Sequence, residues 1–482
     1  MDEPRTVCLL NDSFPPLIDG VANAVVNYAA NIQAHHGRAL VVTPSLPEAD
    51  DSAWPYPVLR YPSIDLRKMV GYMAGYPFSP ETARRVEESH AALLHTHCPI
   101  TSAYLARSLR DVVDAPVVLT YHTKFDIDIA KAVHGKLLQE GAIRALVENI
   151  SACDEVWVVS RGAGENLRSL GYQGDYLVME NGVDVPRGQV AEEVIRAAAA
   201  EYDLPAGVPV FLFVGRLMWY KGLRIILDAL AALRQRGTEF RMVFVGDGTD
   251  GAQVRQYAAQ LGLGDRCFFT GAITDREAIR AWYCRADLFL FPSTFDTNGL
   301  VVREAAACGT ATVMIAGSCA AEGVTDGQNG FFIQEDAASL TEKLTALCAA
   351  PEAMAQVGER ASRELYLSWE EAVDRAWARY EVVIDRYKSG GYPRHRRPMD
   401  SFFKSQGELM EALGQLETVG QEVRDEMRRE RRELRERLHE AGQELGEEWQ
   451  RQRAAMEKRR REEQEKLQAR RDAFWQRMDR YL

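Results

Sequence analysis

Two basic side chains follow a short apolar run in the second half of the chain. Arg216 and Lys221 lie in a loop between an expected strand, 210–215, and an expected helix, 223–235. A diphosphate is bound well by an arginine, which donates two parallel hydrogen bonds, together with a lysine, which supplies a point charge. The pattern favours a diphosphate site over the alternative, a solvated pair of surface cations.

Two carboxylates stand eight residues apart, with a glycine between them at the start of an apolar helix. If both were helical, Asp296 and Glu304 would lie ~12 Å apart, beyond the ~5–9.5 Å of a glycosidase carboxyl pair. They suit a ligand that has a polyol at each end. The backbone amides of Asn298, Gly299 and Leu300 would take a phosphate between them. A nucleoside diphosphate sugar has this layout; the alternative is helix N-terminal charges alone.

Two positions in the first half of the chain also follow expected strands. Gly20 begins an expected helix over 21–35, and its missing Cβ lets a ligand approach the unpaired amides at the helix start. His122 ends the strand expected over 117–122, where an imidazole would hydrogen-bond a reacting hydroxyl or move a proton. The alternatives are an ordinary loop and a structural histidine.

Other motifs point elsewhere but are weaker. The segment Gly246–Gly251 matches the dinucleotide pattern G-x-G-x-x-G, but it follows the second strand of its domain, and nothing nearby suggests hydride chemistry. Asp126-Ile127-Asp128 resembles a metal-binding D-x-D, a spacing that is common by chance. The cluster His95–Cys98 alternates sides on a strand, which is poor chelate geometry. We therefore expect no metal site.

The elements that must position these residues come in two series of alternating strands and helices. Such alternation predicts two doubly wound parallel sheets of the α/β class, with a cleft where the carboxyl ends of their strands converge. We expect domains over 1–188 and 189–365, a further helix within 366–390, a linker over 391–400, and a charged helical tail over 401–482. The expected strands are 6–10, 38–43, 93–97, 117–122, 155–160, 210–215, 241–246, 266–270, 288–292, 312–316 and 331–334.

Composition excludes several classes of protein. The net charge is −12, which argues against a general nucleic-acid binder. The first residues lack a signal-like apolar region, and no apolar run is long enough to span a membrane. The eight cysteines include no Cys-x-x-Cys pair, as in reduced cytosolic proteins. We therefore expect a cytoplasmic protein, with peripheral contact to the inner face of a membrane as an option.

The last 82 residues are a different kind of polymer, with 19 basic and 19 acidic side chains. Apolar residues recur there every eleven positions, which favours a straight or right-handed supercoiled helix. The alternatives are self-association into a homo-oligomer and a single solvated helix. A second surface, proposed for lipid or acceptor contact, comprises Arg60, Arg67, Lys68, Met69, Tyr72, Met73 and Tyr76. The two apolar tracks of the tail are Val423, Leu434, Leu445, Met456, Leu467, Met478 and Leu416, Met427, Leu438, Trp449.

Taken together, the motifs resemble the retaining GT-B glycosyltransferases of family 4 over about residues 6–388. The segment 296–304 corresponds to the family's E-x₇-E element, with Asp296 in place of the first glutamate. The other segments that carry the resemblance are Asp12-Ser13-Phe14, Asp19-Gly20-Val21, Tyr121-His122-Thr123, Glu180–Asp184, Val214–Gly222, Val245–Gly248 and Phe291-Pro292-Ser293.

The resemblance implies a role for each matching residue. Gly20 would admit the donor phosphate, Arg216 and Lys221 would neutralise the diphosphate, and the 298–300 amides would assist. Asp296 would hold the donor sugar, Glu304 the ribose, and His122 would face the reacting sugar. The last helix, 369–387, would cross back to the first domain. No metal is implied, because the cations and a helix dipole would take its electrostatic role.

The resulting hypothesis is a retaining transferase that moves a hexose from a UDP- or GDP-sugar to an envelope glycan, a glycolipid or another hydroxyl acceptor. Because an aspartate is shorter than a glutamate, its carboxylate retracts by ~1 Å, and a shift of that size can cost about 10²-fold in rate. Two alternatives therefore stay open: a nucleotide-sugar epimerase of the same fold, and a non-catalytic scaffold that binds nucleotide sugar and assembles through its tail.

Overall fold

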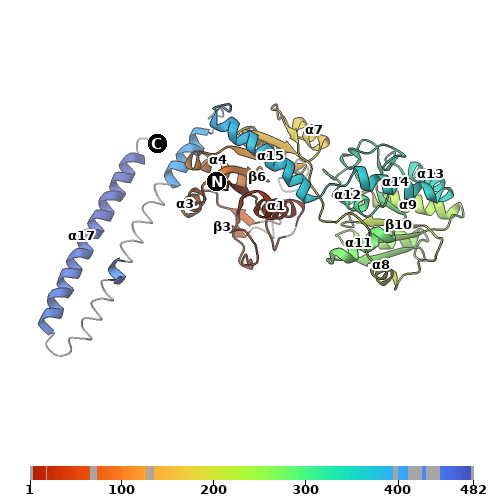
Figure 1. Cartoon of the computed structure of the whole chain (residues 1–482), viewed down its shortest axis with the longest axis horizontal. Helices are drawn as coiled ribbons and strands as arrows, with labels where there is room; N and C mark the ends of the chain where they lie inside the picture. Colours follow the sequence, from red (N-terminus) through yellow and green to blue (C-terminus); the bar gives the residue numbers. More distant parts are fainter. Residues whose placement is uncertain are drawn as a thin grey trace.

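The computed structural model describes residues 4–17, 19–65, 73–125, 129, 135–393, 400–410, 426–429 and 446–478. Its body consists of two α/β units, and a helical tail projects from the first unit on the side away from the second (Figure 1). We call the unit that contains β1–β9 the N-terminal unit and the unit that contains β10–β15 the C-terminal unit. The lipid-contact residues 67–69 and 72, the Asp126–Asp128 motif and much of the tail repeat lie outside the described residues.

The N-terminal unit is built on a seven-stranded parallel sheet in the order β3-β2-β1-β6-β7-β8-β9. Its core strand β1 is buried along its whole length, as its apolar sequence predicts. A separate antiparallel pair, β4 and β5, follows β3. The strands are β1 Thr6–Leu10, β2 Arg38–Pro44, β3 Val58–Tyr61, β4 Ser63–Asp65, β5 Met73–Gly75, β6 Ala91–Thr96, β7 Val117–Tyr121, β8 Glu155–Val158 and β9 Leu177–Val178.

Helices connect these parallel strands. The first, α1, ends four residues before the position expected from the sequence, because Ile32–His36 form a π-helical turn before Gly37. A side chain at Gly37 would overlap the Arg5 carbonyl oxygen and the Trp377 ring, so glycine is required there. The described helices are α1 Gly20–Asn31, α3 Pro80–Glu88, α4 Thr101–Val113, α6 Lys136–Ser151 and α7 Arg161–Ser169.

The C-terminal unit repeats the plan with a six-stranded parallel sheet in the order β12-β11-β10-β13-β14-β15. Its strands fall within one residue of the expected bounds, and α9 has the bounds expected, whereas α8, α13 and α14 were not predicted. The strands are β10 Val210–Val214, β11 Arg241–Val245, β12 Cys267–Gly271, β13 Leu288–Phe291, β14 Thr312–Ile315 and β15 Phe331–Ile333. The helices are α8 Glu192–Ala199, α9 Leu223–Gln235, α10 Gly251–Gln260, α11 Arg276–Arg285, α12 Leu300–Ala307, α13 Ala337–Ala349 and α14 Pro351–Glu364, and η2 Trp219–Lys221 and η3 Cys319–Ala321 are 3₁₀ turns.

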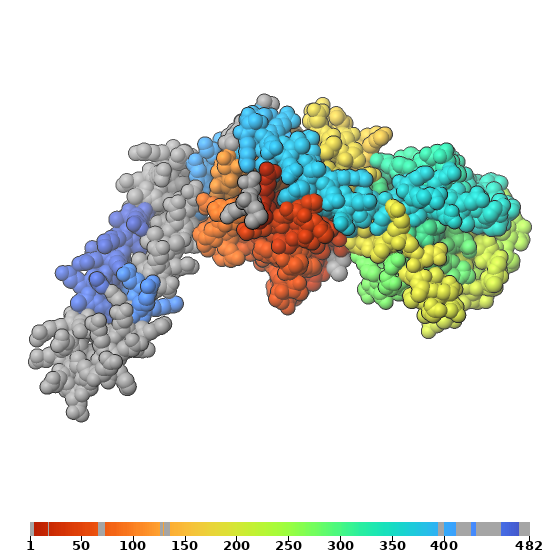
Figure 2. Space-filling view, in the orientation of Figure 1, coloured from red at the N-terminus to blue at the C-terminus, as the bar shows by residue number. Residues whose placement is uncertain are grey.

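The helix α15, Trp369–Lys388, leaves the C-terminal unit and lies across the N-terminal unit (Figure 2). It begins in a capping box made by Ser368 and Glu371. Its apolar face belongs to the same core as β1, α1 and β6, where Tyr380 is almost fully buried. This packing brings a segment from the end of the body next to the first strands of the chain.

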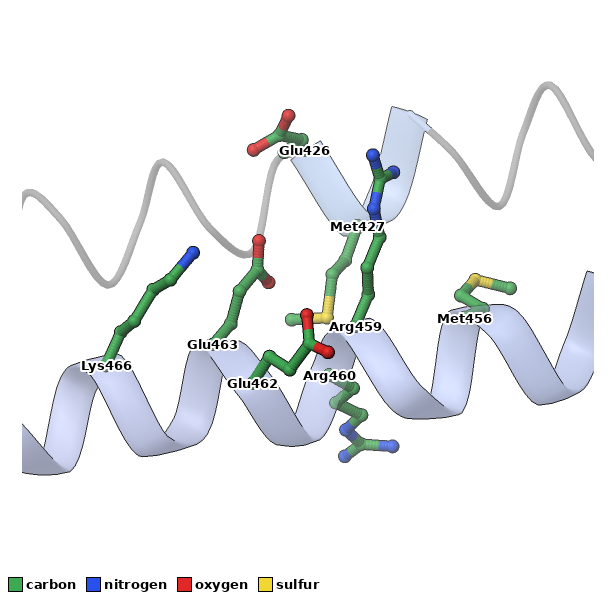
Figure 3. A pocket seen from close by; sticks show the side chains of 8 residues that line it. All are labelled: Glu426, Met427, Met456, Arg459, Arg460, Glu462, Glu463 and Lys466. Carbon is green, nitrogen blue, oxygen red and sulfur yellow. The ribbon is translucent and has the colours of Figure 1, made fainter.

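The tail begins with a helix over 400–410 that packs on α4. Arg107 donates to Asp400 at 2.9 Å, and its guanidinium lies 4.1 Å from the centre of the Phe403 ring. Further on, α17, Gly446–Met478, lies beside the short helix over 426–429 (Figures 1 and 3). Met427 and Met456, one from each apolar track, line the same groove between these helices. The two tracks therefore meet within one chain at this point.

Candidate functional site

Lys221 and Asp296 are held together at the carboxyl edge of the C-terminal sheet. Lys221 Nζ lies 2.7 Å from Asp296 Oδ1, and Ser293 Oγ donates to Asp296 Oδ2 at 2.6 Å. The lysine ends the 3₁₀ turn after β10, and Gly222 follows it with φ = 75°. A side chain at Gly222 would overlap the carbonyl group of Pro292, so this glycine brings the lysine loop against the end of β13.

Arg216 lies in the same loop but is exposed to solvent. One of its Nη atoms lies 3.5 Å from the Tyr220 hydroxyl, at the limit of a hydrogen bond. Tyr220 in turn packs against Phe295, at a ring-centre distance of 4.5 Å. The structure thus gathers Arg216, Lys221 and the aspartate loop at one edge of the C-terminal sheet.

We call residues 215–222, which carry Arg216 and Lys221, the cation loop. The segment that leads into α12 contacts this loop through Asp296. Gly299, with φ = 58°, occupies the N-cap position and packs so closely on Ala320 that any side chain would collide with it. The side-chain amide nitrogen of Asn298 is buried and has no hydrogen-bond partner among the described residues. The start of α12 therefore offers donors to an anion, beside the Lys221–Asp296 pair.

Glu304 lies on α12 and is partly buried. Tyr283 donates to its Oε2 at 2.9 Å. Burial raises the pKa of Glu304 above its ordinary value, and the hydrogen bond from Tyr283 and the charge of Arg276 oppose this rise. Because Asp296 lies in the loop and Glu304 inside the helix, the two carboxylates occupy separate surroundings rather than one shared site.

The glycine-rich loop after β11 packs against the chain itself. Side chains at Gly246 and Gly248 would overlap the backbone of Gly215 and Leu217, respectively. Leu217 also exchanges backbone hydrogen bonds with Asp247 and Asp250. These glycines thus support the Arg216–Lys221 loop. The space beside them is filled by the backbone of that loop, so no dinucleotide can approach them there.

Gly20 lies at the edge of the N-terminal sheet, as expected, and a Cβ there would meet no atom within 4 Å. The expectation of unpaired amides behind it was wrong in part. Asp19 Oδ1 accepts from the backbone nitrogens of Val21 and Ala22, each at 2.8 Å. The residue before the glycine thus caps the helix with its own side chain.

His122 follows β7 and is 6% exposed. Its Nε2 lies 3.0 Å from His97 Nδ1, and its Nδ1 lies 3.5 Å from the side-chain nitrogen of Asn181. Burial lowers the pKa of His122 to about 3, so the ring is neutral at physiological pH. The sequence indicated this histidine and, separately, the segments of His97 and Asn181, but not their contacts with His122, because the separation along the chain gives no local signal.

Direct contacts join the two units at this point. The Thr297 hydroxyl donates to the His122 carbonyl oxygen at 2.6 Å, and the Ser160 hydroxyl donates to the Thr297 carbonyl oxygen at 2.5 Å. Glu322, after η3, accepts from the backbone nitrogens of Arg161 and Gly162 at 2.7 and 2.6 Å. The loop of Asp296 is therefore bound to the strand end of His122. The sequence did not single out Ser160, Thr297 or Glu322.

Within the described part of the chain, no group of three or more His, Cys, Asp or Glu side chains is placed to hold a metal ion. The helices of that part also include none with the length and hydropathy needed to cross a membrane. A groove in the tail is lined by eight mostly charged residues and lies far along the chain from the cation loop (Figure 3).

Two family models account for most of the body. Residues 18–187 match the model described as Glycosyltransferase Family 4, and residues 194–364 match Glycosyl transferases group 1. The chain belongs to glycosyltransferase family 4. This transferase is 21% identical to an alpha-monoglucosyldiacylglycerol synthase of Streptococcus pneumoniae, over 63% of this chain and 70% of the relative. It is 24% identical to a GDP-mannose-dependent alpha-mannosyltransferase of Corynebacterium glutamicum, over 78% and 86%.

Solved structures share the arrangement of this transferase. Anabaena HepE in complex with UDP superposes with a TM-score of 0.63 at 19% identity, covering 78% of this chain and all of that one. Sucrose-phosphate synthase from Thermosynechococcus elongatus gives a TM-score of 0.63 at 22% identity, covering 79% and 99%. The two facing Rossmann-like units are thus the GT-B fold, and the predicted fold class is confirmed.

Proposed function

We propose that this glycosyltransferase moves a hexose from a UDP- or GDP-sugar to a hydroxyl acceptor and retains the anomeric configuration. The observation that carries the proposal is the cluster of Lys221, Asp296 and the start of α12 at one sheet edge, with Arg216 exposed beside it. A cation and helix amides neutralise a diphosphate leaving group. The carboxylate then binds hydroxyls of the sugar.

In this proposal Lys221 exchanges its present partner for the donor. The ion pair with Asp296 holds the lysine ammonium group at the edge of the sheet. When a diphosphate binds, Lys221 Nζ turns to its oxygens and Asp296 is released to accept from sugar hydroxyls, still steadied by Ser293. The acceptor hydroxyl attacks on the face that the leaving group departs from, and a phosphate oxygen takes its proton.

For the acceptor we propose an envelope glycolipid or glycan. Large apolar side chains are exposed on the N-terminal unit, with Ile64 and Tyr76 on or next to the β4–β5 pair and Leu137 and Leu138 at the start of α6. Exposed apolar groups of this kind suit lipid tails or a membrane surface. A relative named for glucosyldiacylglycerol synthesis supports the same class of acceptor. The protein would then work in the cytoplasm, at the inner face of the membrane.

The test is a donor screen with UDP- and GDP-hexoses, together with lipid and oligosaccharide acceptors. We expect release of the nucleotide and formation of a new α-glycoside. Lys221→Ala should lose at least about 100-fold in kcat/KM, since it removes the positive charge that stabilises the diphosphate in the transition state. Lys343→Ala, at an exposed pair with Asp326, is the control and should keep its activity. Full activity in Lys221→Ala would contradict the site, and conversion of the free nucleotide sugar without acceptor would indicate an epimerase.

A further inference from the structure

Three buried imidazoles form a row at the carboxyl edge of the N-terminal sheet. His95 and His97 come from the end of β6, and His122 follows β7. Their exposed fractions are 0%, 1% and 6%. The ring centres of His95 and His97 lie 4.0 Å apart, and the His97 ring stacks on that of His122 at 5.2 Å with 24° between the planes. His122 is the most exposed of the three.

The two ring nitrogens of His122 have different partners. Nε2 has a partner of ordinary hydrogen-bond length in His97 Nδ1, at 3.0 Å. Nδ1 faces the carboxamide of Asn181 at 3.5 Å, which is long, and the Asn181 oxygen is buried with no partner among the described residues. The side of the ring that carries Nδ1 therefore has unused hydrogen-bonding capacity.

The tautomer of His122 depends on this arrangement. Burial lowers the pKa of His97 well below the usual imidazole value, with help from His95 and His122, and burial does the same for His122 itself. A neutral imidazole has one donor nitrogen and one acceptor nitrogen. Whichever role His97 imposes on Nε2, Nδ1 must take the opposite role.

The stack behind His97 is itself fixed. His95 Nδ1 lies 2.6 Å from the Tyr380 hydroxyl of α15, and His95 Nε2 lies 2.7 Å from the Thr120 hydroxyl. Burial keeps the Tyr380 hydroxyl protonated by raising its pKa. Tyr28 packs edge-on against both His95 and His97. The imidazole of His97 thus cannot turn without disturbing a tightly packed core.

We propose that His97 is a positioning residue for His122: it holds Nε2, fixes the orientation of the ring, couples the tautomer of His122 to that of His97, and leaves Nδ1 as the nitrogen presented to a hydroxyl of the bound sugar. His97 touches no substrate. The inference deepens the proposed function and rests on it for the identity of the ligand. The hydrogen bond between the two imidazoles, however, is a property of the unliganded protein.

The experiment compares His97→Phe with His97→Asn in the full chain. Phenylalanine keeps the ring stack but removes the hydrogen bond, whereas the asparagine side chain places a polar atom near the position of Nδ1. In His97→Phe we expect the ¹⁵N signals of the His122 ring to shift towards a different tautomer mixture, without any ligand present. We expect kcat to fall about 100-fold, as for a ~1 Å misplacement, with the KM for the donor within about threefold. His97→Asn should recover part of both.

His95→Phe is the matched control, since it removes a buried imidazole of the same row that has no hydrogen bond to His122, while the phenyl ring keeps the ring packing against Tyr28 and His97. It should lower the melting temperature but leave the His122 signals and kcat near those of the parent. Unchanged His122 signals in His97→Phe, or equal losses of kcat in the two phenylalanine variants, would overturn the inference. If His97→Phe does not fold, His97→Ala decides by the same signals. The ¹⁵N measurement stands even if no transfer is found, so failure of the inference and failure of the proposed function remain distinguishable.

Discussion

Replacing Asp400 with alanine should destabilise the N-terminal unit by several kcal/mol, although the residue lies at the start of the tail. Arg107 on α4 and Asp400 are 2% and 7% exposed at their side chains. The guanidinium also donates to Asn149 at 2.8 Å and stacks on Phe403. In Asp400→Ala these contacts remain, but the buried cation loses its counter-charge.

The magnitude follows from that burial. Removing one partner of a buried pair costs about 3–5 kcal/mol, because an uncompensated charge stays in the interior. For a unit of about 150–250 residues, each kcal/mol lowers the melting temperature by about 2–4 °C. We therefore expect a drop of about 6–20 °C in the transition of the N-terminal unit.

Calorimetry and urea unfolding of the full chain measure this effect, and Glu88→Ala is the control. Glu88 accepts from Arg84 on the exposed face of α3, where both side chains are more than 40% exposed. An exposed pair four residues apart on a helix contributes only about 0.2–0.5 kcal/mol. The double variant Asp400→Leu with Arg107→Met should recover most of the loss, because an apolar pair carries no desolvation penalty.

Equal shifts in Asp400→Ala and Glu88→Ala would refute the reasoning. That result would mean that the helix over 400–410 is not docked on α4 in solution and that Arg107 is solvated. If Asp400→Ala lowers the melting temperature and the double variant does not restore it, the loss comes from the geometry of the helix over 400–410 rather than from the unpaired charge of Arg107.

Two further predictions concern the site. Burial raises the pKa of Glu304, so the folded protein holds the carboxyl proton more tightly than the unfolded chain does. The neutral carboxyl group therefore contributes stability at low pH. This stability is lost as the pH rises through the raised pKa. Glu304→Gln, which mimics the neutral form, should raise the melting temperature at pH 7–8 and weaken donor binding by calorimetry; a lower melting temperature with unchanged binding would contradict this. Glu322→Ala removes two charge-assisted hydrogen bonds between the units at the start of α7, so small-angle scattering should show a larger radius of gyration and the donor KM should rise several-fold, whereas exposed Glu335→Ala should change neither.

Most strands of the two parallel sheets could be read from the sequence because their residues are buried on both faces. Runs such as 6–10 and 210–214 are nearly uniform in apolar residues, and the structure confirms them to within one residue. The edge strands β3 and β9 and the β4–β5 pair were missed. They are short and carry polar or exposed residues, so their periodicity is weak.

The residues of the proposed site were predicted from similar local signals. Arg216 and Lys221 each stand next to a glycine after a strand, and Asp296 precedes the glycine that begins the helix of Glu304, so chain-local signals reveal them. Gly299 and Gly222 then bring their loops into contact, which depends on Ala320 and Pro292. The pairing of Lys221 with Asp296, 75 residues apart, could not be derived from spacing alone.

The sequence by itself determined the α/β class, the two repeated units, the family and the residues with chemical capacity, because these depend on local pattern. Only the tertiary structure decided which side chains meet. In the tertiary structure His122 contacts His97, the Asp19 carboxylate accepts from the first amides of α1, and Glu322 accepts from the first amides of α7. The tertiary structure also placed Met427 and Met456 along one groove between two helices, so that the two apolar tracks of the tail meet within one chain. Such contacts depend on how distant segments pack, which no local signal records.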